Sequence, residues 1–144
     1  MDLTKEYPRS VHAKMLGVVQ LGRTVDKAKA QLAGTIGEYN YDCPMDEALF
    51  EFLGTDGQTV LDIVKNAKND GEIEAQLAPM VQKKNAAEIE KWNHDVVNRQ
   101  PEGESHQYFL NLRNQVAPNR TDVMTWADLL DLDEKRNVPE RATA

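Results

Sequence analysis

A single cysteine, Cys43, occurs among the 144 residues, so the chain cannot form an internal disulfide bond. One cysteine is typical of proteins that work in a reducing compartment. No run of about 18 apolar residues is present, which excludes the usual kind of membrane-spanning helix. The first ten residues, MDLTKEYPRS, lack the basic-then-apolar pattern of a secretory signal. We therefore expect a cytoplasmic protein that does not enter a membrane.

Sequence motifs that identify common enzymes are also missing. The segment GTIG at residues 34–37 has no Lys and Ser/Thr after it, so it is not a phosphate-binding loop. Neither a nucleophile elbow nor a dinucleotide fingerprint is present. Glu90 and His94 are one helical turn apart, but a zinc site needs about three protein ligands. We expect no cofactor and no metal, and these absences favour a non-enzymatic protein while leaving the question of catalysis open.

The charge of the chain is negative overall but uneven. A net charge of −7 argues against nucleic-acid binding, which needs clustered Lys and Arg. Residues 1–36 nevertheless carry six Lys/Arg against three Asp/Glu, which leaves −10 on the remainder. This basic part could attract a small anion or an acidic partner protein. The simpler interpretation is that the two oppositely charged parts of the chain attract each other.

Apolar residues recur at helical spacing along most of the chain. Leu21, Val25, Ala28 and Leu32, for example, follow one another at intervals of four, three and four residues. Signals that begin or end helices occur at Gly34, Pro44, Gly54, Thr55, Asn85, Ser105 and Thr125. The only strand-like run, GVVQL at 17–21, is short. We predict a single compact all-α domain of six or seven short helices over residues 1–134, with a basic, motif-bearing part over about 1–54 and a mobile tail over 135–144.

Cys43 stands directly before Pro44, which is a favoured first residue of a helix. A thiol in that position lies near unpaired backbone N–H groups and the positive end of the helix dipole, which favours the thiolate. Asp42, Asp46 and Glu47 lie within one turn and oppose a further negative charge. We expect a slowly reacting, small packed residue beside a polar pocket. The alternatives are a wall of a ligand pocket and a catalytic thiol.

Arg23, Asp26 and Lys27 fall within about one helical turn and share a face. If Tyr39 and Tyr41 fold over this face, two cations, a carboxylate and two phenols form a pocket for a phosphate or carboxylate. The simpler interpretation is a solvated face with one salt bridge. The candidate ligand-binding residues are Arg23, Asp26, Lys27, Tyr39, Tyr41, Cys43 and Asp46.

The segment DLLDLDE places four carboxylates close together, at Asp128, Asp131, Asp133 and Glu134. Oxygen clusters suit Ca²⁺ or Mg²⁺, but the glycine and terminal glutamate of a calcium loop are absent. We interpret the segment as a solvated acidic helix end, although an acidic C-terminal end opposes the helix dipole. That arrangement is easier to explain if these groups face the basic N-terminal part.

Two blocks of sequence resemble the bacterial domain-of-unknown-function 5069 family over nearly the whole chain. They are LGRTVDKAKAQLAGTIGEYNYDCPMDEALFEFLG and RTDVMTWADLLDLDEKR. The chain departs from the family pattern at Gly22, where proline is common, and at Lys135, where glycine is common. The resemblance implies a compact, largely helical, cytoplasmic bacterial protein. It implies no reaction, because none is established for the family.

Three functions remain in view. The leading hypothesis is a non-enzymatic protein that binds a small anionic ligand or an acidic partner through its N-terminal half. The second is a small enzyme that uses Cys43, Lys27, Asp26 or Tyr41 in the same pocket. The third is a structural or adaptor module. The pattern of residues does not indicate an oligomeric state.

Overall fold

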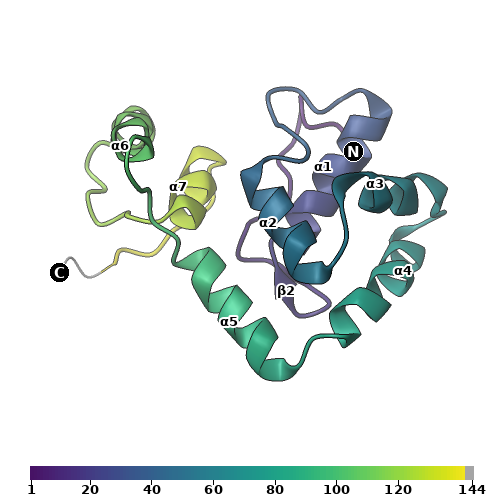
Figure 1. Cartoon of the computed structure of the whole chain (residues 1–144). Coiled ribbons are helices and arrows are strands. Elements are labelled where there is room, and N and C mark those ends of the chain that lie inside the picture. The colour runs from purple at the N-terminus through teal and green to yellow at the C-terminus, as the bar shows by residue number, and fades with distance from the viewer. Residues whose placement is uncertain (142–144) are drawn as a thin grey trace.

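The computed structural model of the protein describes residues 1–141, and helices are the main regular structure of this part of the chain (Figure 1). Its helices are α1 (Leu21–Ala33), α2 (Pro44–Leu53), α3 (Gly57–Asn66), α4 (Asp70–Gln82), α5 (Ala86–Val97), α6 (Ser105–Val116) and α7 (Trp126–Asp133). The strands β1 (Lys14–Met15) and β2 (Val18–Val19) form a short antiparallel pair. The predicted all-α fold is thereby confirmed, and the run at 17–21 supplies β2. Within residues 1–141, no helix combines the length and apolar character that crossing a bilayer requires.

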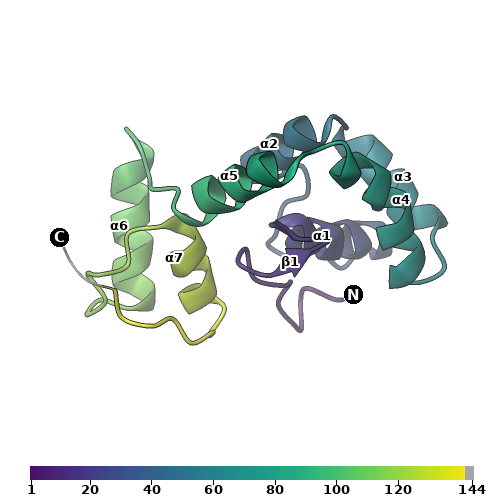
Figure 2. The same cartoon turned by 90° about the horizontal axis from the view of Figure 1, so that it is seen from below.

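The helices form two groups joined by α5 (Figures 1 and 2). Helices α1–α4 gather around one apolar core, which includes Val25, Leu49 and Leu77. Helices α6 and α7 enclose a smaller core that contains Phe109 and Leu129. A third cluster connects the two groups, because residues from the N-terminal segment (residues 1–20, before α1) pack with residues of α5 and α7. Its members are Val11, Val19, Val96 and Ala127.

Helix α1 is buried on nearly all sides, which determines the character of the site. Its apolar stripe behaves as predicted at Leu21, Val25 and Ala28, each fully buried, whereas Leu32 near the C-terminus is exposed. The helix ends at Gly34 in the left-handed conformation (φ 71°) that glycine adopts without strain. The polar side of α1 is covered as well, so its charged side chains must find partners inside the protein.

Helix starts follow the predicted signals at some positions and miss them at others. Asn85 forms a capping box with Glu88, as the sequence predicted. Thr125 caps α7 by accepting a hydrogen bond from the backbone of Asp128. The cap of α3, however, is Asp56 rather than Thr55, since the Asp56 carboxylate accepts the Thr59 N–H at 2.8 Å.

The segment after α7 does not lie free. Val138 is 5% exposed, and Arg141 donates two hydrogen bonds to Asp128 of α7, at 3.0 and 3.1 Å. Arg120, in the loop before α7, donates to the Pro139 carbonyl at 3.1 Å. The expectation of a mobile tail is therefore corrected for residues 135–141, because one buried apolar residue and several ion pairs fix them. Residues 142–144 lie outside the described part of the chain.

Candidate functional site

The three charged residues predicted to share a face of α1 are all buried. Arg23, Asp26 and Lys27 are 4%, 2% and 4% exposed, so the solvated-face interpretation is wrong. They do not form one pocket, either. Each side chain meets a different partner of opposite charge, and these contacts connect α1 to the N-terminal segment, to α2 and to α7.

Arg23 pairs with Glu134, the residue that ends α7. Its Nη1 donates to Oε1 at 2.9 Å and its Nη2 donates to Oε2 at 2.7 Å, which is the two-bond geometry that a guanidinium forms best with a carboxylate. Nη1 also donates to the Arg9 carbonyl at 3.2 Å. Both members of this ion pair are nearly inaccessible to solvent.

Two further donors converge on the same carboxylate. The Tyr39 hydroxyl, from the loop between α1 and α2, donates to Glu134 Oε2 at 2.9 Å. Arg136 donates to Glu134 Oε1 and, with its other terminal nitrogen, to the Pro8 carbonyl. The Arg23 guanidinium lies 5.6 Å from the centre of the Tyr39 ring, within cation–π range. We call Arg23, Tyr39 and Arg136 the carboxylate cradle.

The electrostatics of the cradle keep both members of the pair charged. Burial lowers the pKa of Arg23, but the hydrogen bonds and charge of Glu134 outweigh it, so that pKa lies above its usual value. Burial raises the pKa of Glu134, but the hydrogen bonds and charge of Arg23, together with the hydrogen bonds from Arg136 and Tyr39, outweigh it, so that pKa lies below its usual value. Burial and the charge of Glu134 raise the pKa of Tyr39, which therefore remains a hydrogen-bond donor.

Asp46 is the centre of a second buried cluster. Its carboxylate accepts from Lys27 Nζ at 2.7 Å, from the Thr24 hydroxyl at 2.6 Å and from Gln20 Nε2 at 3.2 Å. Its Oδ2 also accepts from the backbone N–H of Cys43 at 3.4 Å, which closes the start of α2. Lys27 is thus held by an internal counter-ion. No local signal in the sequence indicates the roles of Gln20 and Thr24.

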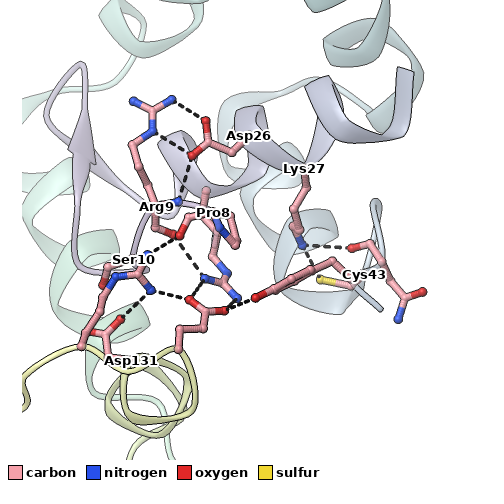
Figure 3. Close-up of polar contacts among 12 residues, drawn as sticks. Pro8, Arg9, Ser10, Asp26, Lys27, Cys43 and Asp131 are labelled. Carbon is pink, nitrogen blue, oxygen red and sulfur yellow. Dashed lines mark hydrogen bonds and ion pairs between the residues drawn. The ribbon is translucent and has the colours of Figure 1, made fainter. Parts of the chain in front are cut away.

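Cys43 is the N-cap of α2, as Pro44 predicted, and it is half-buried. Its Sγ lies 3.4 Å from Lys27 Nζ, which also donates to the Asn40 carbonyl at 3.0 Å (Figure 3). The Tyr41 hydroxyl turns away and donates to the Gly57 carbonyl at 2.7 Å. Of the residues proposed for catalysis, only Cys43 and Lys27 face each other. The slow reaction of the thiol stays a prediction.

Asp26 belongs to a third contact. Arg9 donates to it three times, from its backbone N–H at 2.8 Å and from Nε and Nη2 at 3.1 Å each (Figure 3). Asp26 is therefore not free to contact a ligand. Residues beyond α1 that the sequence did not single out complete the network, and they are Arg9, His12, Arg136 and Arg141. The positive charge of residues 1–36 was a signal that pointed toward Arg9 but not toward His12, which that count treats as neutral.

The acidic end of α7 is mostly buried rather than solvated. Asp128, Asp131 and Glu134 are 4%, 7% and 4% exposed, while Asp133 lies on the exposed side of the helix. The buried carboxylates face His12 and Arg23. They also face Arg136 and Arg141 of the C-terminal segment, which follows α7. The interpretation as a solvated helix end is wrong, and the contact with the basic N-terminal part accounts for the acidic helix end.

Two hollows in the described surface lie apart from Arg23, Lys27 and Cys43. One, of about 640 Å³, is formed between α3 and α4 and includes Ile63 and Gln76. Another, also of about 640 Å³, lies along α5 and is lined in part by His12, Ile89 and His94. Neither includes Arg23, Lys27 or Cys43. At the candidate residues the structure therefore contains a closed network of charges, already satisfied from within the chain.

Comparison with models of known protein families identifies the family of the chain. The sequence model of the family described as Domain of unknown function (DUF5069) matches residues 5–136. No curated protein matches the chain. The matched range includes both sequence blocks noted above, and it spans the N-terminal segment, all seven helices and Arg136.

Proposed function

The chain belongs to the DUF5069 family of unknown function, and we propose that it is a non-enzymatic protein that binds a carboxylate or similar anionic group in its carboxylate cradle. One observation supports this proposal above others. Two guanidinium groups and a phenol, from three separate segments, converge on a single carboxylate. Proteins commonly bind carboxylate and phosphate groups with planar guanidinium groups of this kind.

In the described structure the cradle holds the chain's own Glu134. An external anion must replace this tethered carboxylate, whose effective concentration is on the order of millimolar or higher for a short connection. A single small carboxylate is therefore a weak competitor. An acidic segment of a partner protein, which adds contacts along the basic N-terminal part, competes more strongly. Glu134 thus sets a threshold that selects ligands with more than one anionic group.

A small enzyme is the second candidate function, and one contact favours it. The Cys43 Sγ lies 3.4 Å from the Lys27 Nζ at the start of α2, which brings a nucleophilic sulfur and an amine together. Against it, Asp26 and Tyr41 are engaged elsewhere, and neither described hollow reaches Cys43. We rank this candidate below anion binding for those reasons.

We infer a bacterial, cytoplasmic setting for this activity. The single cysteine supports a reducing compartment, because Cys43 is half-buried and lies against Lys27 rather than being placed for a disulfide. The resemblance of both sequence blocks to a bacterial family supports the source. Fractionation of the native host cells, with the protein detected by antibody, would test the compartment.

The cradle can be tested by replacing its internal ligand. In Glu134→Ala the cradle loses its carboxylate, and the protein becomes less stable because two guanidinium groups lack their partner. Sodium formate should then raise the melting temperature of this variant more than it raises that of the wild type, because formate fills the place of the missing carboxylate. Sodium chloride at equal ionic strength controls for screening.

A second variant makes this test specific to the cradle. Glu134→Ala combined with Arg23→Met lacks the guanidinium that binds both carboxylate oxygens. The proposal predicts no formate effect beyond that of chloride in the double variant. Equal formate effects in the two variants would overturn it. If Glu134→Ala does not fold, Glu134→Gln, which keeps the shape of the side chain, takes its place.

A further inference from the structure

His12 lies between two carboxylates of α7, Asp128 and Asp131. It is 119 residues away in sequence from Asp131, the one that lies nearer in space. Its Nδ1 is 3.0 Å from Asp131 Oδ2, and its Nε2 is 3.5 Å from Asp128 Oδ1. Both ring nitrogens therefore face a carboxylate oxygen. Only the doubly protonated imidazolium can donate toward both, because a neutral imidazole has one N–H and directs a lone pair at the other carboxylate.

We propose that His12 is a pH-sensitive latch that holds α7 against the N-terminal segment when protonated and loosens this junction when it loses its proton. The inference rests on the contacts of His12 and stands whether or not an external anion ever replaces Glu134. Histidine is suited to this role because its charge changes near neutral pH.

The surroundings of His12 on every packed element fit the proposal. On α7 the two carboxylates are almost buried, and the His12 ring faces both of them from the N-terminal segment. From the C-terminal segment, Arg141 bonds to Asp128 and Arg136 lies 3.6 Å from Asp131. The Ser10 hydroxyl is 3.5 Å from Nδ1 on the segment of His12 itself.

Solvent reaches the ring from one side only. His12 is about one-third exposed, and it borders the hollow along α5, which Lys14, Glu90 and His94 also line. The hydrogen bond with Asp131 raises the pKa of His12, while burial partly opposes this change. The pKa of Asp131 lies below its usual value: burial raises it, but the hydrogen bonds from His12 and Ser10 together with the charges of His12 and Arg136 outweigh burial. Both directions favour the ion pair over the neutral pair.

The sign of the pH effect follows from these contacts. A histidine whose pKa is higher in the folded protein stabilises the fold fully below its unfolded value of about 6.5. That stabilisation is lost as the pH rises through the folded pKa. The loss is local, because α7 is held to the N-terminal segment at this point. Glu134 lies one turn further along the same helix, so the latch also secures the residue that occupies the cradle.

Amide hydrogen exchange on the full chain tests the latch directly. The opening equilibrium of α7, corrected for the intrinsic pH dependence of exchange, is compared between about pH 6 and about pH 8, where His12 changes its charge. In the wild type α7 should open more at the higher pH. In His12→Gln the ratio of the two opening constants should fall to one, because the uncharged amide does not titrate. His94→Gln, an exposed histidine beside the same hollow, should keep the wild-type ratio.

The alternative outcomes overturn the proposal. A wild-type ratio of one, or an equal loss of protection at both pH values in His12→Gln, would mean that His12 is only a packing residue. If His12→Gln fails to fold, the ring resonances of His12 in wild-type protein give the answer by NMR titration. A midpoint above about 6.5 agrees with the latch, and a midpoint at or below that value overturns it.

Discussion

Arg23 and Glu134 form a two-bond ion pair that joins α1 to the end of α7 across 111 residues of sequence. Both side chains are at most 5% exposed, so water does not screen the pair. The pair also connects the two blocks of sequence that resemble the family. The position of α7 against α1 therefore depends on a buried pair of opposite charges, and the loss of either one leaves the other without its main partner.

Breaking this pair on one side should be costly. Arg23→Ala leaves a buried carboxylate without its main partner, and we expect a loss of about 3–5 kcal/mol in the free energy of unfolding. Urea denaturation measures it. Replacing both members by apolar residues, in Arg23→Met with Glu134→Leu, should recover most of that loss. Equal losses in the single and double variants would show that packing, not charge, holds this junction.

Asp46 should be the most sensitive carboxylate of α2. It is fully buried and accepts from Lys27, Thr24 and Gln20, so Asp46→Ala leaves several donors unpaired and should cost about 3–5 kcal/mol. The exposed neighbour Glu47 offers a control, because Glu47→Ala should change stability by less than about 0.5 kcal/mol. Chemical denaturation of both variants gives the comparison, and similar values would contradict the buried cluster.

Tyr39 and Tyr41 should ionise late on an alkaline titration. Burial is the main cause that raises the pKa of each phenol, followed by the charge of Glu134 for Tyr39 and of Asp46 for Tyr41. Above about pH 10 the unfolded chain loses these protons first, so stability falls as the pH rises. Phenolate absorbance from these residues should appear together with loss of helical circular dichroism. In Tyr39→Phe and Tyr41→Phe, that late absorbance should be smaller; an unchanged late fraction would contradict the assignment.

The C-terminal segment should contribute to stability. Val138→Ala removes part of a buried side chain, and we expect a loss of about 2 kcal/mol. Deleting residues 137–144 should lower the melting temperature further, because the contacts of Arg141 with Asp128 are lost too. Glu140→Ala, at an exposed position in the same segment, should have little effect. A truncated protein that melts at the wild-type temperature would restore the expectation of a free tail.

Helices were predictable because their signals are local. The stripe of Leu21, Val25 and Ala28 and the caps at Asn85 and Thr125 depend on neighbours within a few residues. The same locality explains the errors. Apart from proline, the tail has a single aliphatic side chain larger than alanine, so periodicity cannot detect the buried Val138.

The pairing of charges was not predictable in the same way. The positive charge of residues 1–36 and the acidic segment near α7 indicated attraction, but they did not say which groups meet. The sequence pattern alone allows Arg23 to pair with any of several carboxylates. Its partner is determined only when the fold brings the end of α7 beside α1. Tyr39 lies over Arg23, whereas the loop between α1 and α2 turns the hydroxyl of Tyr41 toward Gly57, and no local pattern separates these two outcomes.

The structure of Glu134→Ala determined in the presence of formate tests the central claim most directly. The account predicts a formate ion bonded to both terminal nitrogens of Arg23 and to the Tyr39 hydroxyl, in the place that the Glu134 carboxylate occupies in the wild type. A site that closes without an ion, with Arg23 paired to another residue of the chain, would contradict it.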